Sequence, residues 1–179
     1  MIRVLADSGS TKTDWMIKNM DTGQQCRWQT RGINPSLMND TQIIEILVSE
    51  VRPKMSLFLE SVADFSLKKS DILESRLENS SISSRHSLID SLSFYGSGCR
   101  PEQCERMQHL LSTSLNAQNV YVASDLLGAA RALCGTKEGI VCILGTGSAS
   151  ALYDGEAFVQ STPSLGYILG DEGSGTSLG

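Results

Sequence analysis

The amino-acid sequence predicts an α/β protein made of two related lobes. Three observations support this: a three-strand pattern opens the chain, a second one occupies residues 139–161, and the first turns of the two patterns resemble each other. Segments with helical periodicity lie between the two patterns. We therefore expect each lobe to begin with a β-meander.

The first meander is predicted from alternating apolar and polar residues near the N-terminus. The segments "IRVLA" (2–6), "DWMIK" (14–18) and "QQCRWQT" (24–30) read as short strands, and the D-T-G turn at 21–23 separates the last two. Between the first two strands lies "DSGSTKT", a run of small, polar and basic residues. This composition indicates a tight hairpin turn.

A helix should follow the first meander. Apolar residues recur at positions 43, 44, 47, 48 and 51, which is helical spacing, and Pro53 should end the helix. The predicted helix runs from Thr41 to Arg52. Residues 51–91 are rich in serine and charged residues, and we expect them to form an insertion or a mobile segment.

The next elements alternate between strand and helix. "LSFYG" (92–96) and "NVYVAS" (119–124) read as strands, and "PEQCERMQHLLSTSL" (101–115) reads as an amphipathic helix that begins with proline. "LLGAARALC" (126–134) follows as a helix. Segments 139–145, 148–155 and 156–161 then form the second meander. This division predicts lobes at 1–135 and 136–179.

The two meanders show an internal repeat. Placing "VLADSGSTKTDWMIK" above "CILGTGSASALYDG" puts Gly9 over Gly147 and Ser10 over Ser148. The repeat suggests that both lobes present similar turns to a common cleft.

Composition excludes several classes of function. The 15 basic and 20 acidic residues give a net charge of -5, which offers no cationic face for nucleic acid. No apolar run approaches the roughly 20 residues of a membrane span, so we expect a cytoplasmic protein. Five cysteines without a C-x-x-C pair argue against a disulfide framework or a zinc site.

The turn sequences restrict which phosphate chemistry is available. "GSTKT" is not a P-loop because Thr11 stands where that motif needs glycine, and "GTGSAS" lacks the third glycine of a dinucleotide fingerprint. Hairpin turns whose backbone N–H groups converge on an anion remain possible. Asp7 would then hold Mg²⁺, usually through water. The alternative is an ordinary hairpin in which Asp7 caps its own backbone.

Four blocks of the sequence together resemble a known family. "LADSGSTKTDW", "SDLLGAARAL", "CILGTGSASALYDG" and "LGYILGDEGSG" are similar to the N-acetylglucosamine kinase and BadF-type ATPase branch of the sugar kinase/Hsp70/actin superfamily. The resemblance implies a ribonuclease H-like actin-type ATPase fold, here the N-terminal lobe and the start of the second. It also implies ATP and Mg²⁺ as cofactors and a small sugar as the partner molecule.

The resemblance assigns roles to residues of four kinds, for the ATP phosphates, the sugar, the proton transfer and the metal. The phosphates would be bound by Gly9, Ser10, Thr11, Lys12, Gly145, Thr146 and Gly147; the sugar by Asn34, Asp125, Ser148, Gly166 and Asp171; the catalytic carboxylate would be Asp125 and the Mg²⁺ residue Asp7. Two alternatives stay open at this point. Asp125 has the position of a helix N-cap, and Asn34 that of a turn former before proline.

The resemblance leaves three classes of activity open. The first is transfer of the ATP γ-phosphoryl group to a hydroxyl of N-acetylglucosamine or a related amino sugar. The second is a BadF-type ATPase that activates a partner enzyme. Such activators share an iron–sulfur cluster across a dimer, and only Cys99 and Cys104 lie close in this sequence. The third is a sugar-sensing regulator, which usually carries a helix-turn-helix.

The resemblance also predicts the extent and assembly of the protein. Relatives are substantially longer, and the chain stops after "GDEGSG", where a further helix is expected. We therefore expect a fragment whose second lobe is truncated, and the expectation of activity applies to the complete protein. A homodimer is possible.

Overall fold

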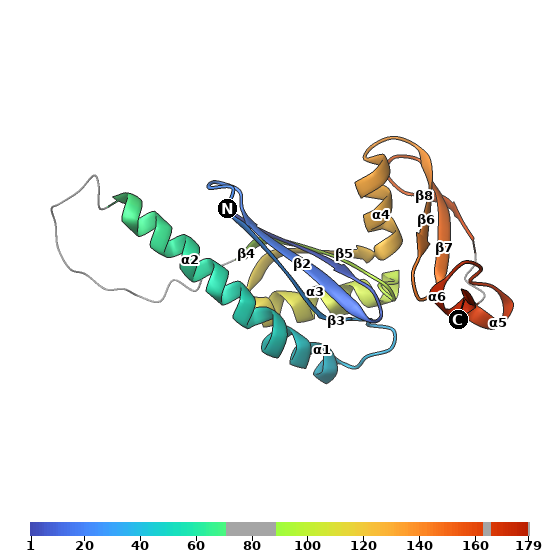
Figure 1. The fold of residues 1–179 in the computed structure, drawn as a ribbon, viewed down its shortest axis with the longest axis horizontal. Helices are drawn as coiled ribbons and strands as arrows, with labels where there is room; N and C mark the ends of the chain where they lie inside the picture. Colours follow the sequence, from blue (N-terminus) through green and yellow to red (C-terminus); the bar gives the residue numbers. More distant parts are fainter. Residues whose placement is uncertain (71–88, 163–165, 179) are drawn as a thin grey trace.

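The computed structural model describes residues 1–70, 89–162 and 166–178, which form two β-sheets with helices packed against them (Figure 1). None of the helices in these ranges combines the length and apolar character needed to cross a membrane. The predicted α/β class is confirmed. In chain order the elements are β1 (Ile2–Ser8), β2 (Lys12–Asn19), β3 (Gln25–Arg31), α1 (Asp40–Ile46), a π-helical turn (Leu47–Val51), α2 (Arg52–Ser70), β4 (Ile89–Gly96), α3 (Pro101–Leu115), β5 (Ala117–Ser124), α4 (Asp125–Cys134), β6 (Gly139–Leu144), β7 (Ser148–Tyr153), β8 (Phe158–Ser161), α5 (Gly166–Leu169) and α6 (Gly175–Leu178).

The first sheet has five strands in the order β3-β2-β1-β4-β5. Strands β1 to β3 form the predicted antiparallel meander, and β4 and β5 run parallel to β1. Because side chains alternate across a strand, Val4 and Ala6 of β1 share one buried face with Trp15 and Ile17 of β2. This mixed topology is the expected ribonuclease H-like arrangement.

A long helical stretch from α1 to α2 packs on this buried face. Asn39 caps it, accepting from the Gln42 N–H while the Gln42 side chain accepts from the Asn39 N–H. Our prediction that the helix ends at Arg52 is wrong, since it continues to Ser70. Proline lacks an N–H and crowds the carbonyl four residues earlier. The wider π turn immediately before Pro53 accommodates it, with the Arg52 N–H donating five residues back to Leu47.

The segment 51–91, predicted to be an insertion or a mobile segment, contributes to the core in the part that the structure describes. Val51, Met55, Phe58 and Val62 lie in the core of the first lobe, spaced as one helical face. At its other end, the segment includes the first residues of β4, which begins at the buried Ile89. Residues 71–88 of this prediction lie outside the described residues.

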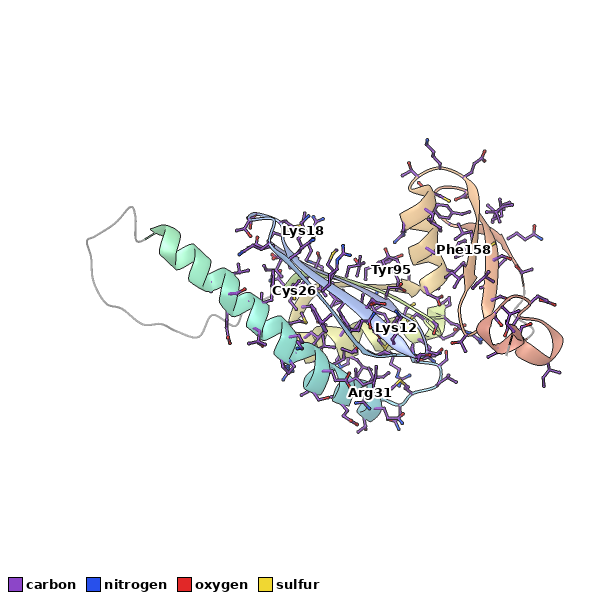
Figure 2. All side chains as sticks on the ribbon, viewed as in Figure 1. Lys12, Lys18, Cys26, Arg31, Tyr95 and Phe158 are labelled. Carbon is purple, nitrogen blue, oxygen red and sulfur yellow. The ribbon has the colours of Figure 1, made fainter. Side chains whose placement is uncertain are left out.

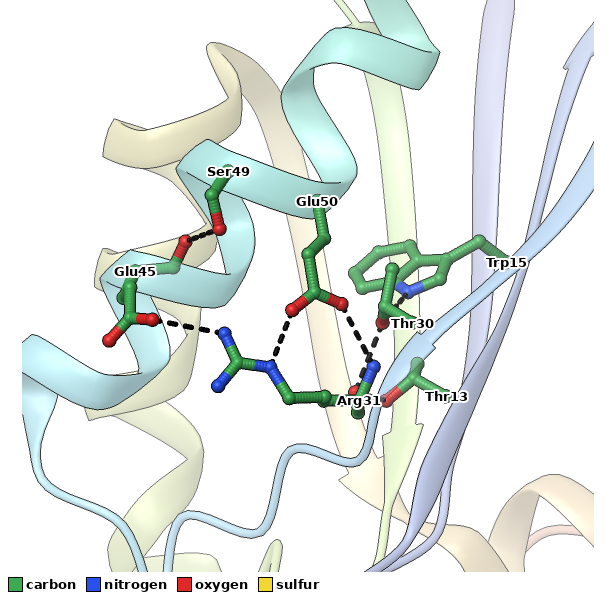
Figure 3. A network of polar contacts seen from close by, with 7 residues as sticks. All are labelled: Thr13, Trp15, Thr30, Arg31, Glu45, Ser49 and Glu50. Carbon is green, nitrogen blue, oxygen red and sulfur yellow. Dashed lines mark hydrogen bonds and ion pairs between the residues drawn. The ribbon is translucent and has the colours of Figure 1, made fainter.

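A surface network joins the long helix to the end of β3 (Figure 3). The Arg31 guanidinium contacts Glu50 and also Glu45, the latter at 3.1 Å, and the Arg31 backbone N–H donates to Glu50 Oε2 at 3.0 Å. Burial raises the pKa of Glu50, but the hydrogen bonds and charge of Arg31 outweigh it, so that this pKa lies below its ordinary value. The ionised carboxylate therefore stabilises the fold.

We expect Glu50→Gln to lower the free energy of unfolding by about 0.2–1 kcal/mol at neutral pH, the range of exposed ion pairs. Because the folded-state pKa is lowered, the wild-type contribution is complete above the ordinary value and is lost as pH falls through the folded-state value. Urea unfolding at neutral and acidic pH measures both effects. Glu105→Gln, which removes an exposed carboxylate on α3, is the control; an equal loss in that variant would contradict the account.

The parallel strands of the first sheet bring three chain segments to one edge. The predicted helix at 101–115 is confirmed, and it ends at Asn116 in the left-handed conformation, with φ 54°. Register pairs join Ser8 to Gly96 and Gly96 to Ser124, at the carboxyl ends of β1, β4 and β5. In this topology, that edge is where ligands bind.

The second sheet is the predicted antiparallel meander, in the order β6-β7-β8. Leu126 and Ala130 of α4 pack with Val141, Ala151 and Tyr153 in a second, smaller core. Figure 1 shows α4 between the two sheets. The lobe boundary at 135/136 stays a prediction, and α4 contributes side chains to the core on the far side of it.

The internal repeat is present with a corrected alignment. The first hairpin has four residues between the paired Ser8 and Thr13, whereas the second has three, residues 145–147, between Leu144 and Ser148. Strand pairing therefore makes Gly9 equivalent to Gly145, two positions earlier in the chain than the Gly147 of the sequence alignment. The loops share one bond: the first loop residue donates its N–H to the last loop carbonyl, at 2.9 Å in both.

Candidate functional site

The first candidate phosphate turn has a fixed base and an open tip. Ser8 Oγ and Thr13 Oγ1 are 2.6 Å apart, and both residues are fully buried. The Gly9 N–H donates to the Lys12 carbonyl at 2.9 Å, while residues 10–11 are exposed. The turn therefore holds its shape without a ligand and presents its tip to solvent.

Gly32 lets the chain after β3 pass directly against this turn. The Gly32 N–H donates to the Thr11 carbonyl at 3.0 Å. A Cβ atom at Gly32 would lie 2.5 Å from the Gly9 oxygen and 2.6 Å from the Ser10 oxygen. These are backbone atoms that cannot rotate away, so only glycine fits here.

Asn34 lies beside the first turn, as predicted for a sugar contact. Its Nδ2 is 3.4 Å from the hydroxyl oxygens of both Ser10 and Ser97, and its Oδ1 accepts from the Ser36 N–H at 3.0 Å. The turn-forming role and the site position are therefore both present. A Cβ at Gly98 would lie 1.9 Å from Asn34 Oδ1, and Gly98 has φ 75°, so glycine is required there too.

Arg106 of α3 holds the loop that carries Asn34. Its two Nη atoms donate to the carbonyls of Pro35 and Met38 at 2.8 Å each, and its Nε contacts Asp40 at 2.6 Å. Guanidinium groups suit such multiple contacts because their donors form a rigid fork. Arg106 therefore fixes the path of the loop after Asn34.

Asp125 begins α4 at the carboxyl end of β5. Ser124 is the N-cap, its Oγ accepting from the Leu127 N–H at 3.3 Å, so the alternative that Asp125 caps the helix is wrong. Asp125 Oδ1 accepts from the Leu126 N–H at 2.8 Å. Burial raises the pKa of Asp125, the Leu126 bond lowers it, and the charge of Asp7 raises it, with a net increase.

Asp7 lies near Asp125 at the same edge of the sheet. Burial raises its pKa, the facing carboxylate of Asp14 raises it further, and Lys12 lowers it. A divalent cation would offset this repulsion, so the residues fit the predicted Mg²⁺. No group of three potential metal ligands gathers within the described ranges, and phosphate or water oxygens would therefore complete the shell around the ion.

We expect Asp7→Asn to lower the pKa of Asp125, because the substitution removes a neighbouring negative charge. Carboxyl ¹³C chemical shifts, followed as pH is varied, measure that pKa directly and need no enzymatic activity. Asp21→Asn, in the β2–β3 turn at the far end of the sheet, is the control and should leave it unchanged. An unchanged pKa in Asp7→Asn would show that the two carboxylates do not interact.

The second candidate turn, residues 145–147, accepts hydrogen bonds from the C-terminal segment. The Gly175 N–H donates to the Gly145 carbonyl and Thr176 Oγ1 donates to the Thr146 carbonyl, both at 2.7 Å. The turn is not buried in a hydrophobic interior, since Gly145 and Thr146 are exposed and Gly147 is half-buried. It thus shares a fixed base and an accessible tip with the first turn.

Asp171 lies against the second turn. Its Oδ1 accepts from the Ser148 N–H at 3.3 Å, and a Cβ at Gly147 would be 3.4 Å from Oδ2. Asp171 has φ 64°, a conformation that non-glycine residues adopt infrequently. Gly166 starts α5, with φ 71° and open space around it. Ser148 and Asp171 thus lie next to the second turn, whereas the described contacts do not bring Gly166 to it.

The predicted site residues form two groups. Asp7, the first turn, Asn34 and Asp125 gather at the edge of the first sheet, and residues 145–148 gather with Asp171. No hydrogen bond within the described ranges joins the groups. In Figure 1 the second sheet stands beyond the end of the first sheet that carries the β1–β2 turn, and α6, which contacts the second turn, lies at its lower edge.

Cys99 is a buried thiol, as expected, and not a reactive one. It is 3% exposed, and burial, with smaller effects of Cys104 and Asp125, raises its pKa to about 12. Burial also raises the pKa of Cys104. Thiolates are the form that binds metal, so this pair is poorly suited to hold an iron–sulfur cluster.

Comparisons with known proteins place the fold. No family model matches the chain, and no curated protein matches it. A proposed N-acetylglucosamine kinase from Porphyromonas gingivalis is 41% identical with a TM-score of 0.77, the match covering 98% of this chain and 53% of that chain.

Two more distant structures support the fold alone. A proposed N-acetylglucosamine kinase from Chromobacterium violaceum is 18% identical with a TM-score of 0.62, covering 97% of this chain and 52% of that one. An ethanolamine utilization protein from Carboxydothermus hydrogenoformans is 16% identical with a TM-score of 0.54, and the match covers 94% of this chain and 54% of that one. The chain spans about half the length of these solved structures.

Proposed function

We propose that the chain is the N-terminal half of an actin/Hsp70-like ATPase, and that the complete protein is an ATP-dependent kinase that phosphorylates N-acetylglucosamine or a related amino sugar at a hydroxyl. One observation carries the proposal. A half-buried carboxylate with a raised pKa, Asp125, shares a strand edge with an open glycine-bearing turn and with Asn34. The 41% identity to a proposed kinase of this sugar adds support.

The two turns are suited to hold the phosphates of ATP. Gly9, Ser10, Thr11 and Lys12 on one side, and residues 145–147 on the other, offer backbone N–H groups, hydroxyls and one ammonium group. Their bases are fixed by internal hydrogen bonds. Donors that are in place before charge develops stabilise a phosphoryl transition state without reorganising.

The sugar would lie between Asn34 and the second turn. Asn34 Nδ2 offers a donor to a hydroxyl or acetamide oxygen, and its 3.4 Å contacts with Ser10 and Ser97 are long enough to be exchanged for a ligand. Asp171, Ser148 and Gly166 would complete the set with carboxylate and backbone groups. Sites that satisfy many hydroxyls discriminate against analogues lacking one.

Asp125 would act as the general base. Its carboxylate accepts the proton of the attacking sugar hydroxyl as the oxygen forms a bond to the γ-phosphorus and the bond to the ADP oxygen breaks. Positioned bases contribute about 10²–10⁴-fold to such a reaction. The raised pKa makes Asp125 a stronger base than an exposed aspartate. Mg²⁺ held by Asp7 would neutralise phosphate charge.

The test is ATP consumption by the purified complete protein, measured with and without the sugar. The proposal predicts ADP formation that depends on N-acetylglucosamine and yields one sugar phosphate per ADP. Sugar-independent hydrolysis would instead favour an ATPase that activates a partner enzyme, and sugar binding without turnover would favour a sensor. Either result would overturn the kinase assignment.

A further inference from the structure

Helix α4 contacts both lobes, through different faces. Leu126 and Ala130 belong to the core of the second sheet. Gly128 and Arg131, three residues apart and therefore neighbours on the helix surface, contact the first sheet. Figure 2 shows Tyr95 on the first sheet beside the base of α4, and Phe158 on the other side of the helix. Movement of one lobe against the other must therefore change one of these two contacts.

The contact with the first sheet is close. A Cβ atom at Gly128 would lie 2.8 Å from Cβ and Cγ of Tyr95, so the helix backbone passes directly over this side chain. Any larger residue at position 128 would push α4 away from β4. Since Asp125 lies one turn earlier on α4, its place at the strand edge depends on this approach.

The Arg131 side chain connects the same face of α4 to the first sheet. Its Nη1 donates to the Tyr95 hydroxyl at 3.0 Å, and its guanidinium carbon lies 4.9 Å from the ring centre of Tyr121. The two tyrosine rings also contact each other, with centres 6.0 Å apart. Tyr95 comes from β4 and Tyr121 from β5, so one side chain of α4 spans two strands of the first sheet.

We propose that Arg131, with Tyr95 and Tyr121, is a positioning group that fixes α4 on the first sheet and so sets the orientation of the second lobe. It holds Asp125 at the edge that carries the first turn and fixes the second turn relative to it. The catalytic consequence rests on the proposed function, but the structural consequence does not. Arg131 itself touches no phosphate-turn or sugar residue in the described contacts.

Two exposed cysteines allow the distance between the two sheets to be measured. Cys26 on β3 and Cys142 on β6 are exposed, one on each sheet, and Figure 2 labels Cys26. Cys104 and Cys134 would be replaced by serine. Cys99 can stay, because its burial and a pKa of about 12 keep the thiol protonated and protected from labelling. Spin labels on Cys26 and Cys142 then report the distance between the sheets by pulsed electron paramagnetic resonance.

The variants separate the contributions of the three side chains. Arg131→Ala should broaden and shift the distance distribution, Tyr95→Phe should do so less, and Arg131→Lys should restore part of the wild-type distribution because it keeps a cation over Tyr121. Arg3→Ala is the matched control, an exposed arginine on the first sheet. It should leave the distribution unchanged.

An unchanged distribution in Arg131→Ala would overturn the proposal, as would an equal change in Arg3→Ala. If Arg131→Ala does not fold, Tyr95→Phe decides in the same way. In a kinase assay, Arg131→Ala should lower kcat by up to about 10²-fold with little change in KM, the effect of a misplaced reactive group. The distance measurement needs neither ATP nor sugar, so failure of the kinase assignment would not be mistaken for failure of this proposal.

Discussion

Asp125→Asn is expected to reduce sugar phosphorylation by about 10²–10⁴-fold while nucleotide affinity stays within a factor of a few. The amide has nearly the shape of the carboxylate but cannot accept the hydroxyl proton. Because burial raises the pKa of Asp125, the wild-type activity should also fall on the acid side at a pH above the ordinary aspartate value of about 3.8. Steady-state kinetics with varied pH, together with calorimetric titration of a nonhydrolysable ATP analogue, measures both.

Asp21→Asn, on the exposed β2–β3 turn, is the matched control for loss of one carboxylate and should keep full activity. Two outcomes would contradict the assignment of Asp125 as the base. One is near-normal turnover in Asp125→Asn. The other is equal loss of turnover and nucleotide affinity, because it would indicate a structural defect.

Gly32→Ala is expected to lower both the stability of the fold and the affinity for nucleotide. The added methyl would lie 2.5–2.6 Å from backbone atoms of Gly9 and Ser10, so the first turn must move. Overpacking of this kind costs about 1–3 kcal/mol of unfolding free energy. Since the displaced atoms belong to the proposed phosphate turn, we also expect nucleotide binding to be lost.

Gly145→Ala is the appropriate comparison for stability, because the position has open space and no left-handed backbone. Urea unfolding should show a loss in Gly32→Ala and almost none in Gly145→Ala. Equal stability of the two variants would mean that the close approach of Gly32 to the first turn does not constrain it. A stable Gly32→Ala that still bound nucleotide would remove this turn from the site.

Elements with a strong local pattern could be predicted from the sequence. The alternation in residues 2–30 gave three strands within two residues of their ends, and Pro101 marked the first residue of α3. The continuation of the long helix past Pro53 could not be predicted, because the π turn that accommodates this proline leaves no local signal in the sequence. Only the burial of residues such as Met55 against the sheet shows that the helix continues.

The candidate site shows the same difference between residues with a local sequence signal and residues that depend on packing. Residues in the glycine-bearing turns, and Asp125 at a strand end, could be proposed for the site because they stand in short motifs that resemble those of a known family. Arg106 was missed because it reaches the loop of Pro35 across 71 positions of sequence. Arg131 was missed for a similar reason, since its partners lie on two strands of the first sheet that are distant in sequence or across a strand–helix turn. Such contacts depend on how elements pack, and no periodicity predicts them.

The central claim is that the turns at Gly9 and Gly145 both bind the same polyphosphate. The most direct test is a ¹⁵N-resolved NMR titration of the protein with Mg²⁺ and a nonhydrolysable ATP analogue. The account predicts that amide signals of residues 9–12 and 145–147 shift together, with one dissociation constant. Shifts confined to one turn, or two different dissociation constants, would contradict it.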